Sequence, residues 1–436
     1  MSELIQLIGL RVVQCKAAFL FIMNSFTMNE DILTNFNDFI SFNYLNSYLN
    51  SSAHTSNFDD YLFRVRKGLI TIDYDKAMEF ISGKTNDISY SAIYQLSQCI
   101  IKQEHTGRFK RKTWGVEFKG KPAIDAGGVT NQTISMATSS FLYPMTEICV
   151  VFPNKTESKP GQEHLTNILV IPYPSKNDES TQNILYAFGQ VLGSIIRGGI
   201  NQDIPFPLFV WDYLIGKPIT AKDIYENDKL LEDEIKNLKN GNIKDHEWVY
   251  RDWNNIQQKI NEFPEKQYVT KELSEVYERI VLNTRIKSLE SRLIHIRKGL
   301  WNNIDIDDNI CSHLNGSLIR FLTNGNSKFD CKGIIKKVVC KNGTTQLKNN
   351  LKTILDEFDV PTMKCFLRFV TNNEKPPNFA IVPGFCIYVN FHSDISKLPV
   401  AHTCFNTIDV PSYPSIEIMK EKLKTAIFGC FGLDIV

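Results

Sequence analysis

The sequence predicts an α+β fold that is divided into more than one domain. The chain has 436 residues, which is enough for two or three domains. Hydrophobic residues make up 43% of the chain, so large cores can be buried. Segments with the apolar period of an amphipathic helix are interspersed with short runs that alternate as strands do, and no internal repeat is present. This pattern indicates helices combined with small sheets.

The first 70 residues are expected to form a helical extension with polar joints. Beyond it, the stretches "YDKAMEFI" and "YSAIYQLSQCII" have a helical period. The stretch "TWGVEF" places Trp114, Val116 and Phe118 on one face, which indicates a strand. Two further runs, "ICVVF" (148–152) and "NILVI" (167–171), are predicted to pair as strands.

A long amphipathic helix is predicted from Ile184, because apolar residues recur at helical spacing until Gly198–Gly199 ends the pattern. The run "FCIYVNF" (385–391) is a predicted strand. The last helix is predicted over "SIEIMKEKLKTAIFG", with Ser415 as its N-cap. Its apolar stripe consists of Ile416, Met419, Leu423 and Ile427.

Charge and composition argue against several classes of partner. Lys plus Arg (49) nearly balances Asp plus Glu (48), and a net charge of +1 favours neither nucleic acid nor an anionic membrane. No apolar run reaches the roughly 18 residues of a membrane helix. The ten cysteines form no C-x-x-C pair and the histidines do not cluster with them, so we expect neither a metal nor a cofactor. Scattered cysteines suit a reducing compartment, and the expected location is the cytoplasm, with the nucleus as the alternative.

Residues 232–266 are highly charged, with Trp248, Tyr250 and Trp253 interleaved. One interpretation is a solvated helical face with a few buried anchors. The other is a docking surface, because exposed aromatic residues are enriched at protein interfaces.

Cys404 is the candidate nucleophile, because it lies in a loop or short strand ahead of the last helix. A cysteine attacks as its thiolate, and in an extended segment His402 would share a face with Cys404. The hydroxyl of Thr403 could donate a hydrogen bond. Spacing alone leaves open that Cys404 is one more small buried residue, which is a common role of cysteine.

The stretch "LPVAHTCFNTIDVPSYPSIEIMKEKLKTAI" resembles the C-terminal signature of HECT-type ubiquitin ligases. That signature has Leu-Pro, Thr-Cys-Phe, an L-x-L-P-x-Y run and a helix ending in Ala-Ile. Three upstream stretches match the family in the expected order: "WGVEFKGKPAIDAGGVT", "FGQVLGSIIRGGINQDIPFPLFVWDYLIGKPITAKDI" and "FLRFVTNNEKPP". The resemblance covers about residues 70–436, and "HTCFN" is similar to the HERC-like branch.

The resemblance implies a bilobal architecture. A mainly helical N-lobe with small sheets would occupy residues 71–342, and a smaller mixed α/β C-lobe would occupy residues 343–436. A flexible hinge is implied at about 340–343, where "CKNG" stands. The subdomain that docks a ubiquitin-conjugating enzyme is implied at about 235–300.

The activity that the resemblance implies is that of a ubiquitin-protein transferase. Cys404 would accept ubiquitin from a conjugating enzyme as a thioester and pass it to lysines of protein substrates. His402 and Thr403 would tune the thiolate and orient the carbonyl, and Phe405 is a further supporting residue of the same motif.

The chain departs from the family at three places. Lys121 stands where the family usually has Glu, Asn131–Gln132 stand where it has Arg-Glu, and "VTNN" replaces "VTG". These departures leave open a HECT-like scaffold that binds ubiquitin or a conjugating enzyme without transfer. A thiol hydrolase is a second alternative, and it would need a fixed general base such as His402.

Overall fold

The structure is a computed structural model. It describes residues 69–102, 115–120, 128–143, 146–151, 169–198, 200–243, 245–261, 268–304, 311, 314–325, 329–371, 373–377 and 384–429. The expected helical extension at residues 1–70 lies outside this part of the chain, apart from Leu69 and Ile70, which begin the first strand.

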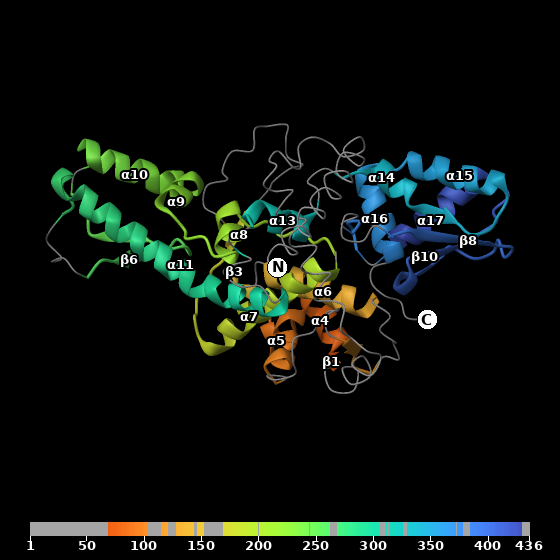
Figure 1. Cartoon of the computed structure of the whole chain (residues 1–436), viewed down its shortest axis with the longest axis horizontal. Coiled ribbons are helices and arrows are strands. Elements are labelled where there is room, and N and C mark those ends of the chain that lie inside the picture. The colour runs from red at the N-terminus through yellow and green to blue at the C-terminus, as the bar shows by residue number, and fades with distance from the viewer. Residues whose placement is uncertain are drawn as a thin grey trace, which may run out of the picture.

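The described residues form two hydrophobic cores. One gathers residues between Ile70 and Leu322, and the other gathers residues between Ile334 and Ile427. We call these parts the first lobe and the second lobe. Figure 1 shows the second lobe at one end of the molecule and, at the other, an arm that projects from the first lobe. The arm consists of α9 (Ala221–Asn227), α10 (Lys229–Asn240), β5 (Val249–Arg251), β6 (Gln257–Lys259), η3 (Lys271–Leu273) and the adjoining part of α11 (Ser274–Ile304). The predicted α+β fold class is confirmed.

Two parallel strands, β1 (Leu69–Ile72) and β2 (Gly115–Phe118), begin the first lobe. Val116 and Phe118 are buried, as the predicted alternation requires, while Trp114 lies outside the described residues. Helical segments pack around these strands: α4 (Tyr74–Ile81), η1 (Ile88–Tyr90), α5 (Ala92–Lys102) and α6 (Gly128–Leu142). The two predicted helices in this region are confirmed.

The centre of the first lobe is a pair of long helices, α7 (Glu179–Gly198) and α11. The end of α7 at Gly198 agrees with the prediction. Gly189 and Gly299 let the two backbones approach closely, since a Cβ at Gly189 would lie 2.1 Å from the carbonyl oxygen of Ile296. Further described elements of the lobe are β3 (Cys149–Val151), β4 (Val170–Pro172), α8 (Leu208–Leu214) and α13 (Gly316–Asn324). Strands β3 and β4 pair antiparallel, as predicted.

Gly189→Ala is expected to lower the free energy of unfolding by about 1–3 kcal/mol, because the new methyl group must push the α7 and α11 backbones apart. Gly429→Ala is the matched control. A Cβ there meets nothing within 4 Å, so the change is expected to be neutral or slightly stabilising. Urea unfolding of both variants measures the difference, and equal unfolding midpoints would contradict the close contact.

The second lobe is built on a four-stranded sheet. Its strand order is β7 (Val338–Cys340), β8 (Ile387–His392), β10 (Thr407–Pro411) and β9 (Val400–His402). Strands β7, β8 and β10 are parallel, and β9 is antiparallel at the edge. The helices of the lobe are α14 (Cys331–Lys336), α15 (Thr345–Asp356), α16 (Val360–Thr371) and α17 (Ile416–Gly429).

The predicted strand at 385–391 and the predicted last helix are both present in the second lobe. Met419, Leu423 and Ile427 are buried along α17, and Ile416 packs against the same core. The backbone N–H of Ile418 donates to Ser415 Oγ at 3.3 Å, which is the expected N-cap contact.

The segment proposed as the hinge, about 340–343, is tied to the second core. Asn342 Nδ2 donates to the carbonyl of Phe391 at 2.9 Å, and the Phe391 N–H donates to Asn342 Oδ1 at 2.6 Å. Gly343 has a φ of 87° and lies so close to the Phe391 ring that a Cβ would be 2.4 Å from it. Helix α14 and strand β7 precede this segment and also belong to the second lobe. The chain therefore passes between the cores upstream, between Leu322 and Ile334.

Candidate active site

Cys404 lies in a short 3-10 turn, η4 (Thr403–Phe405), between the edge strand β9 and strand β10. The chain reverses at Asn406, whose φ of 48° is left-handed and whose N–H donates to the carbonyl of Thr403 at 3.4 Å. The backbone of Cys404 is described and its side chain is not. The predicted loop position ahead of the last helix is thus a turn between two paired strands.

His402 is held by a carboxylate on the neighbouring strand. Its Nε2 lies 2.9 Å from Asp409 Oδ2, and Asn390 Nδ2 donates to Asp409 Oδ1 at 3.0 Å. Strand pairing brings these three side chains together. Asp409 is directly opposite Asn390 on β8, and His402 on β9 is directly opposite Thr407, two residues before Asp409. Burial alone would raise the pKa of Asp409, but the hydrogen bonds from Asn390 and His402 outweigh it and lower the pKa below its ordinary value.

An ionised Asp409 fixes the tautomer of His402. The carboxylate accepts a hydrogen bond, so His402 Nε2 carries the proton and Nδ1 is the ring nitrogen left to accept one when the imidazole is neutral. Sequence reasoning missed Asp409 and Asn390. The β-hairpin would have revealed Asp409, because a diagonal cross-strand pair with His402 follows once β9 and β10 are paired.

The other two predicted supporting residues lie at the ends of η4. Thr403 is half-buried, and Phe405 exposes 66% of its surface. The Phe405 carbonyl accepts from the Thr407 hydroxyl at 3.1 Å. The turn lies against α16 of its own lobe and against α6 of the first lobe.

Tyr413, the tyrosine of "PSY" after the turn, bonds to the residue just before the "LP" that precedes the turn. Its ring is buried, and its hydroxyl donates to the carbonyl of Lys397 at 2.5 Å. The segment that enters β9 is thereby tied to the segment that leaves β10. Burial raises the pKa of the Tyr413 hydroxyl, which keeps it a donor at neutral pH.

Two of the departures from the family fall on α6, the helix that faces η4. Asn131 is half-buried, and Gln132 is buried with its Nε2 donating to the Tyr74 hydroxyl at 3.3 Å. Lys121 lies outside the described residues. The departures at Asn131 and Gln132 therefore lie on a helix of the first lobe that also contacts the candidate turn.

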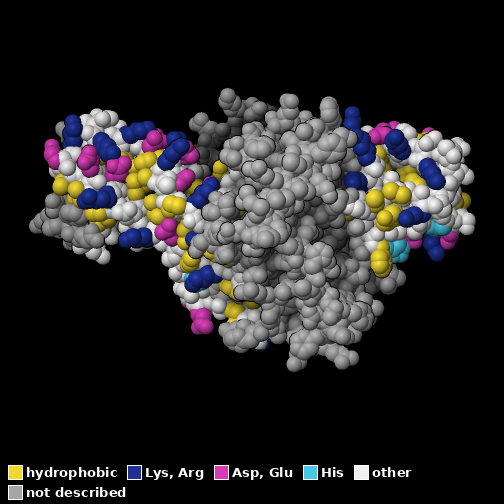
Figure 2. Space-filling view, in the orientation of Figure 1, with side chains coloured by type: hydrophobic (Ala, Val, Ile, Leu, Met, Phe, Trp, Pro, Cys, Tyr) yellow, Lys and Arg dark blue, Asp and Glu magenta, His cyan; other side chains and the backbone are white. Residues whose placement is uncertain are grey.

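The aromatic residues of the charged segment are not an exposed surface, so this basis for the docking interpretation was wrong. Trp248 and Trp253 are 5% and 3% exposed, and Tyr250 is half-buried. They stabilise the interior of the arm, where Trp253 Nε1 donates to the carbonyl of Arg285 at 3.0 Å. Among the described residues of the arm, the exposed large apolar side chains are Leu230, Ile256 and Tyr268. Figure 2 shows basic and acidic side chains mixed over α9 and α10.

Within the described ranges, no three His, Cys, Asp or Glu side chains come together as metal ligands would. Among the helices of that same part of the chain, none combines the length and apolar character needed to cross a membrane.

A model of the HECT domain, described as a ubiquitin-transferase domain, matches residues 136–435. The chain is 24% identical to E3 ubiquitin-protein ligase HERC2 of Mus musculus over 343 residues, which are 74% of this chain and 7% of that protein. It is 23% identical to human HERC2 over 342 residues, with the same coverage. It is also 23% identical to the probable E3 ubiquitin-protein ligase HUL4 of Eremothecium gossypii over 356 residues, 73% of this chain and 39% of that protein. The chain thus spans well under half of these relatives, and its match to the domain model extends over most of its own length and through the Cys404 turn. The chain belongs to the HECT-domain family of ubiquitin transferases.

Proposed function

We propose that this protein accepts ubiquitin from a conjugating enzyme as a thioester on Cys404 and transfers it to lysines of protein substrates. The observation that carries the proposal is that the family match includes residues 398–415, where Thr-Cys-Phe forms the turn between β9 and β10. The proposed partners are ubiquitin, a conjugating enzyme and protein substrates. The proposed location is the cytoplasm, because cysteines without paired motifs suit a reducing compartment.

In the first step, the Cys404 thiolate attacks the carbonyl carbon of the incoming thioester. A new C–S bond forms, the C–S bond to the conjugating enzyme breaks, and that enzyme's sulfur leaves as a thiolate. One thioester replaces another, so the protein mainly has to place the two sulfurs within reach of the same carbonyl.

In the second step, a substrate lysine amine attacks the thioester on Cys404. A C–N bond forms, the C–S bond to Cys404 breaks, and the amine loses a proton. His402 Nδ1 is the proposed acceptor of that proton, because Asp409 occupies the other ring nitrogen. Asp409 acts here as a positioning residue, and Asn390 orients its carboxylate.

The arm is the proposed docking site for the conjugating enzyme. It includes most of the segment that the family resemblance assigns to that role, residues 235–300, and it exposes Leu230, Ile256 and Tyr268. Exposed apolar side chains of this size are typical anchors of protein interfaces.

A non-reducing gel tests the proposal. The protein is incubated with activating enzyme, ATP, ubiquitin and a broad panel of conjugating enzymes. We expect an adduct of one ubiquitin that a thiol reagent removes. No adduct with any conjugating enzyme of the panel would contradict transfer and favour the scaffold alternative.

The pairing of His402 with Asp409 also fits a thiol hydrolase, because it resembles the fixed base that such an enzyme requires. The two functions differ in what they need. A hydrolase would release ubiquitin from a small-molecule thioester without a conjugating enzyme, whereas the transferase is expected to leave that thioester intact and to discharge ubiquitin onto added lysine.

Asp409→Asn is expected to slow discharge of ubiquitin from Cys404 onto free lysine by about tenfold or more, because His402 loses the carboxylate that fixes its tautomer. Charging of Cys404 should change much less, and the pH profile of discharge should shift. Asp394→Asn is the control, since Asp394 is an exposed carboxylate of the same lobe. It accepts a hydrogen bond from the Ser396 N–H. Equal slowing of charging and discharge, with an unshifted pH profile, would indicate a structural role only.

A further inference from the structure

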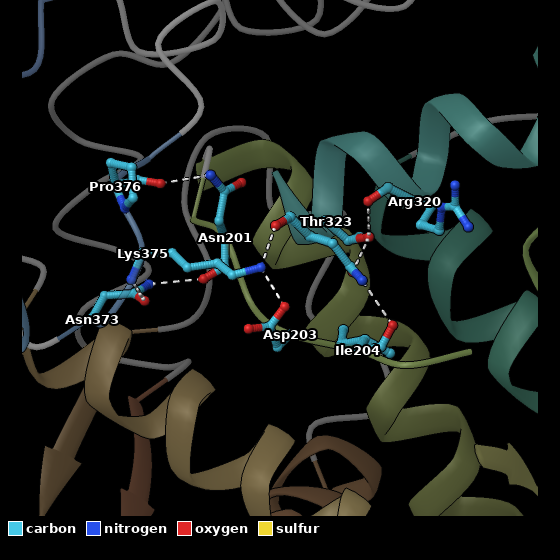
Figure 3. Close-up of polar contacts among 9 residues, drawn as sticks. Asn201, Asp203, Ile204, Arg320, Thr323, Asn373, Lys375 and Pro376 are labelled. Carbon is cyan, nitrogen blue, oxygen red and sulfur yellow. Dashed lines mark hydrogen bonds and ion pairs between the residues drawn. The ribbon is translucent and has the colours of Figure 1, made fainter. Parts of the chain in front are cut away.

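A set of polar contacts joins the two lobes on the side of the first lobe where α7 and α13 end (Figure 3). We call it the interlobe clasp. It consists of Asn201 and Asp203 after α7, Asn324 at the end of α13, and Asn373, Lys375 and Pro376 after α16.

Asn201 bonds to the second lobe through both its side chain and its backbone. Its Nδ2 donates to the carbonyl of Pro376 at 2.6 Å, and its own carbonyl accepts from Asn373 Nδ2 at 3.1 Å. Asn201 is only 4% exposed, so these contacts are shielded from water and are stronger than surface hydrogen bonds.

Lys375 provides the second half of the clasp. Its ammonium group pairs with the carboxylate of Asp203 and donates to the carbonyl of Asn324 at 2.9 Å. The Lys375 side chain is 15% exposed, although Asp203 is 69% exposed. Lys375 thus reaches into the first lobe, where it contacts the segments after α7 and at the end of α13.

The first-lobe side of the clasp is itself braced. The Gln202 N–H donates to the carbonyl of the fully buried Thr323 at 2.8 Å, and Asn324 Nδ2 donates to the carbonyl of Ile204 at 2.8 Å. Gly325 has a φ of 70°, and a Cβ there would lie 2.5 Å from Asn201 Nδ2. The chain therefore leaves the first core immediately beside the clasp.

The candidate turn also lies at the contact between the lobes. With the lobes joined in this way, η4 lies against α6. Figure 1 shows the arm and the second lobe at opposite ends of the molecule, with the helices of the first lobe between them. A conjugating enzyme docked on the arm would thus be separated from Cys404.

We propose that the interlobe clasp holds a docked state of the second lobe, and that it must open before Cys404 can take ubiquitin from an enzyme bound to the arm. The docked state does not depend on the proposed function, whereas the requirement that the clasp open before charging rests on it. Asn373 lies in the "VTNN" stretch that departs from the family, and its side chain supplies one of the contacts of the clasp.

A charge swap tests the clasp directly. The variants are Asp203→Lys, Lys375→Asp and the double exchange, with Lys352→Asp as a control reversal of an exposed charge on α15 of the same lobe. Donor and acceptor dyes are attached through an unnatural amino acid in place of Lys222 on α9 and Glu421 on α17, both exposed. Single-molecule energy transfer in the free protein then measures the docked and released populations.

Each single reversal is expected to raise the ratio of released to docked molecules by about 2- to 10-fold, because it places like charges together. The double exchange should recover part of the docked population. Recovery is only partial, because the double exchange restores the ion pair but loses the hydrogen bond from Lys375 to the Asn324 carbonyl. An aspartate carboxylate at position 375 cannot donate to that carbonyl. The same histogram for wild type, both single variants and the double exchange would overturn the clasp.

Single-turnover charging from a loaded conjugating enzyme tests whether the clasp must open before charging. The single reversals should charge faster than wild type by a factor similar to the change in released population, and the double exchange should return toward wild type. Slower charging in the single variants would mean that the docked state is the competent one, and would overturn the gating role. Absence of charging in every protein would refute the proposed function and the gate together, while the dye histograms would still decide whether the clasp exists.

Discussion

Cys404→Ala is expected to abolish the ubiquitin adduct and every transfer to lysine, because no other atom of the motif can form the thioester. Cys404→Ser should form an adduct slowly, since a serine hydroxyl is a far weaker nucleophile than a thiolate at neutral pH. The bond it forms is an oxyester, which thiol reagents do not cleave. The expected pattern is a thiol-labile band in wild type, a thiol-resistant band in the serine variant and no band in the alanine variant.

Cys340→Ala is the matched control, because Cys340 is a half-buried cysteine of the same lobe. Burial raises the pKa of the Cys340 thiol, and nearby Lys348 offsets this only in part, so Cys340 is a poor source of thiolate. Its replacement should leave the adduct unchanged. A band that survives Cys404→Ala and disappears in Cys340→Ala would identify Cys340 on β7 as the nucleophile. That result would refute the assignment of Cys404.

Arg285→Ala is expected to destabilise the first lobe by about 3–5 kcal/mol, because it leaves a buried carboxylate without its cation. Arg285 Nη1 lies 2.6 Å from Asp228 Oδ2, and both side chains are almost fully buried. The guanidinium also stacks at 4.0 Å from the centre of the Trp253 ring. One substitution therefore removes an ion pair that holds the start of α10 to α11 and a cation–π contact that holds the loop between β5 and β6 to α11.

Asp228 has a second role that makes the loss asymmetric. Its Oδ1 accepts from the Leu231 N–H at 3.0 Å and caps α10. Asp228→Asn leaves the Arg285 guanidinium without its carboxylate, but it can keep the cap and the stacking of Arg285 on Trp253. It should therefore cost less than Arg285→Ala, which loses the ion pair and the stacking together. Arg279→Ala, an exposed arginine on the same helix, is expected to change the free energy of unfolding by less than about 0.5 kcal/mol. Chemical denaturation of the three variants measures these differences, and equal effects at 279 and 285 would contradict a buried pair.

Much of the fold could be predicted from local patterns. The alternation at Val116 and Phe118, the helical stripe of α17 and the glycine that ends α7 each depend on side-chain periodicity or on one residue's backbone preference, and the structure contains all three. The position of Cys404 in a connection before the last helix was predicted in the same way.

Long-range contacts were not predictable in this way. Trp248 and Trp253 lie in a charged segment, and only the packing of that segment on α11 shows that they are buried. Asp409 lies seven residues after His402 in the chain, and the two side chains meet only when β9 and β10 pair. The Asn-Gly sequence predicted a turn or a hinge, and local patterns could not show that Asn342 and Gly343 contact Phe391, about fifty residues further on.

The departures from the family gain a physical context from the same contacts. Gln132 is packed in α6, a helix that contacts the candidate turn, and Asn373 joins the lobes through Asn201. Asn373 lies where the two lobes meet, and neither residue lies on the sheet of the second lobe. Asn373 therefore bears on the contact between the lobes.

The most direct test of the central claim is to locate the ubiquitin bond by mass spectrometry. The adduct of the Cys404→Ser variant is stable enough to digest with trypsin, and cleavage after Lys397 and Lys420 releases the peptide 398–420, in which position 404 is the only cysteine site of the natural sequence. The predicted result is this peptide carrying the C-terminal remnant of ubiquitin on residue 404. A remnant found only on lysines, or on a peptide that contains another cysteine, would contradict Cys404 as the carrier of ubiquitin.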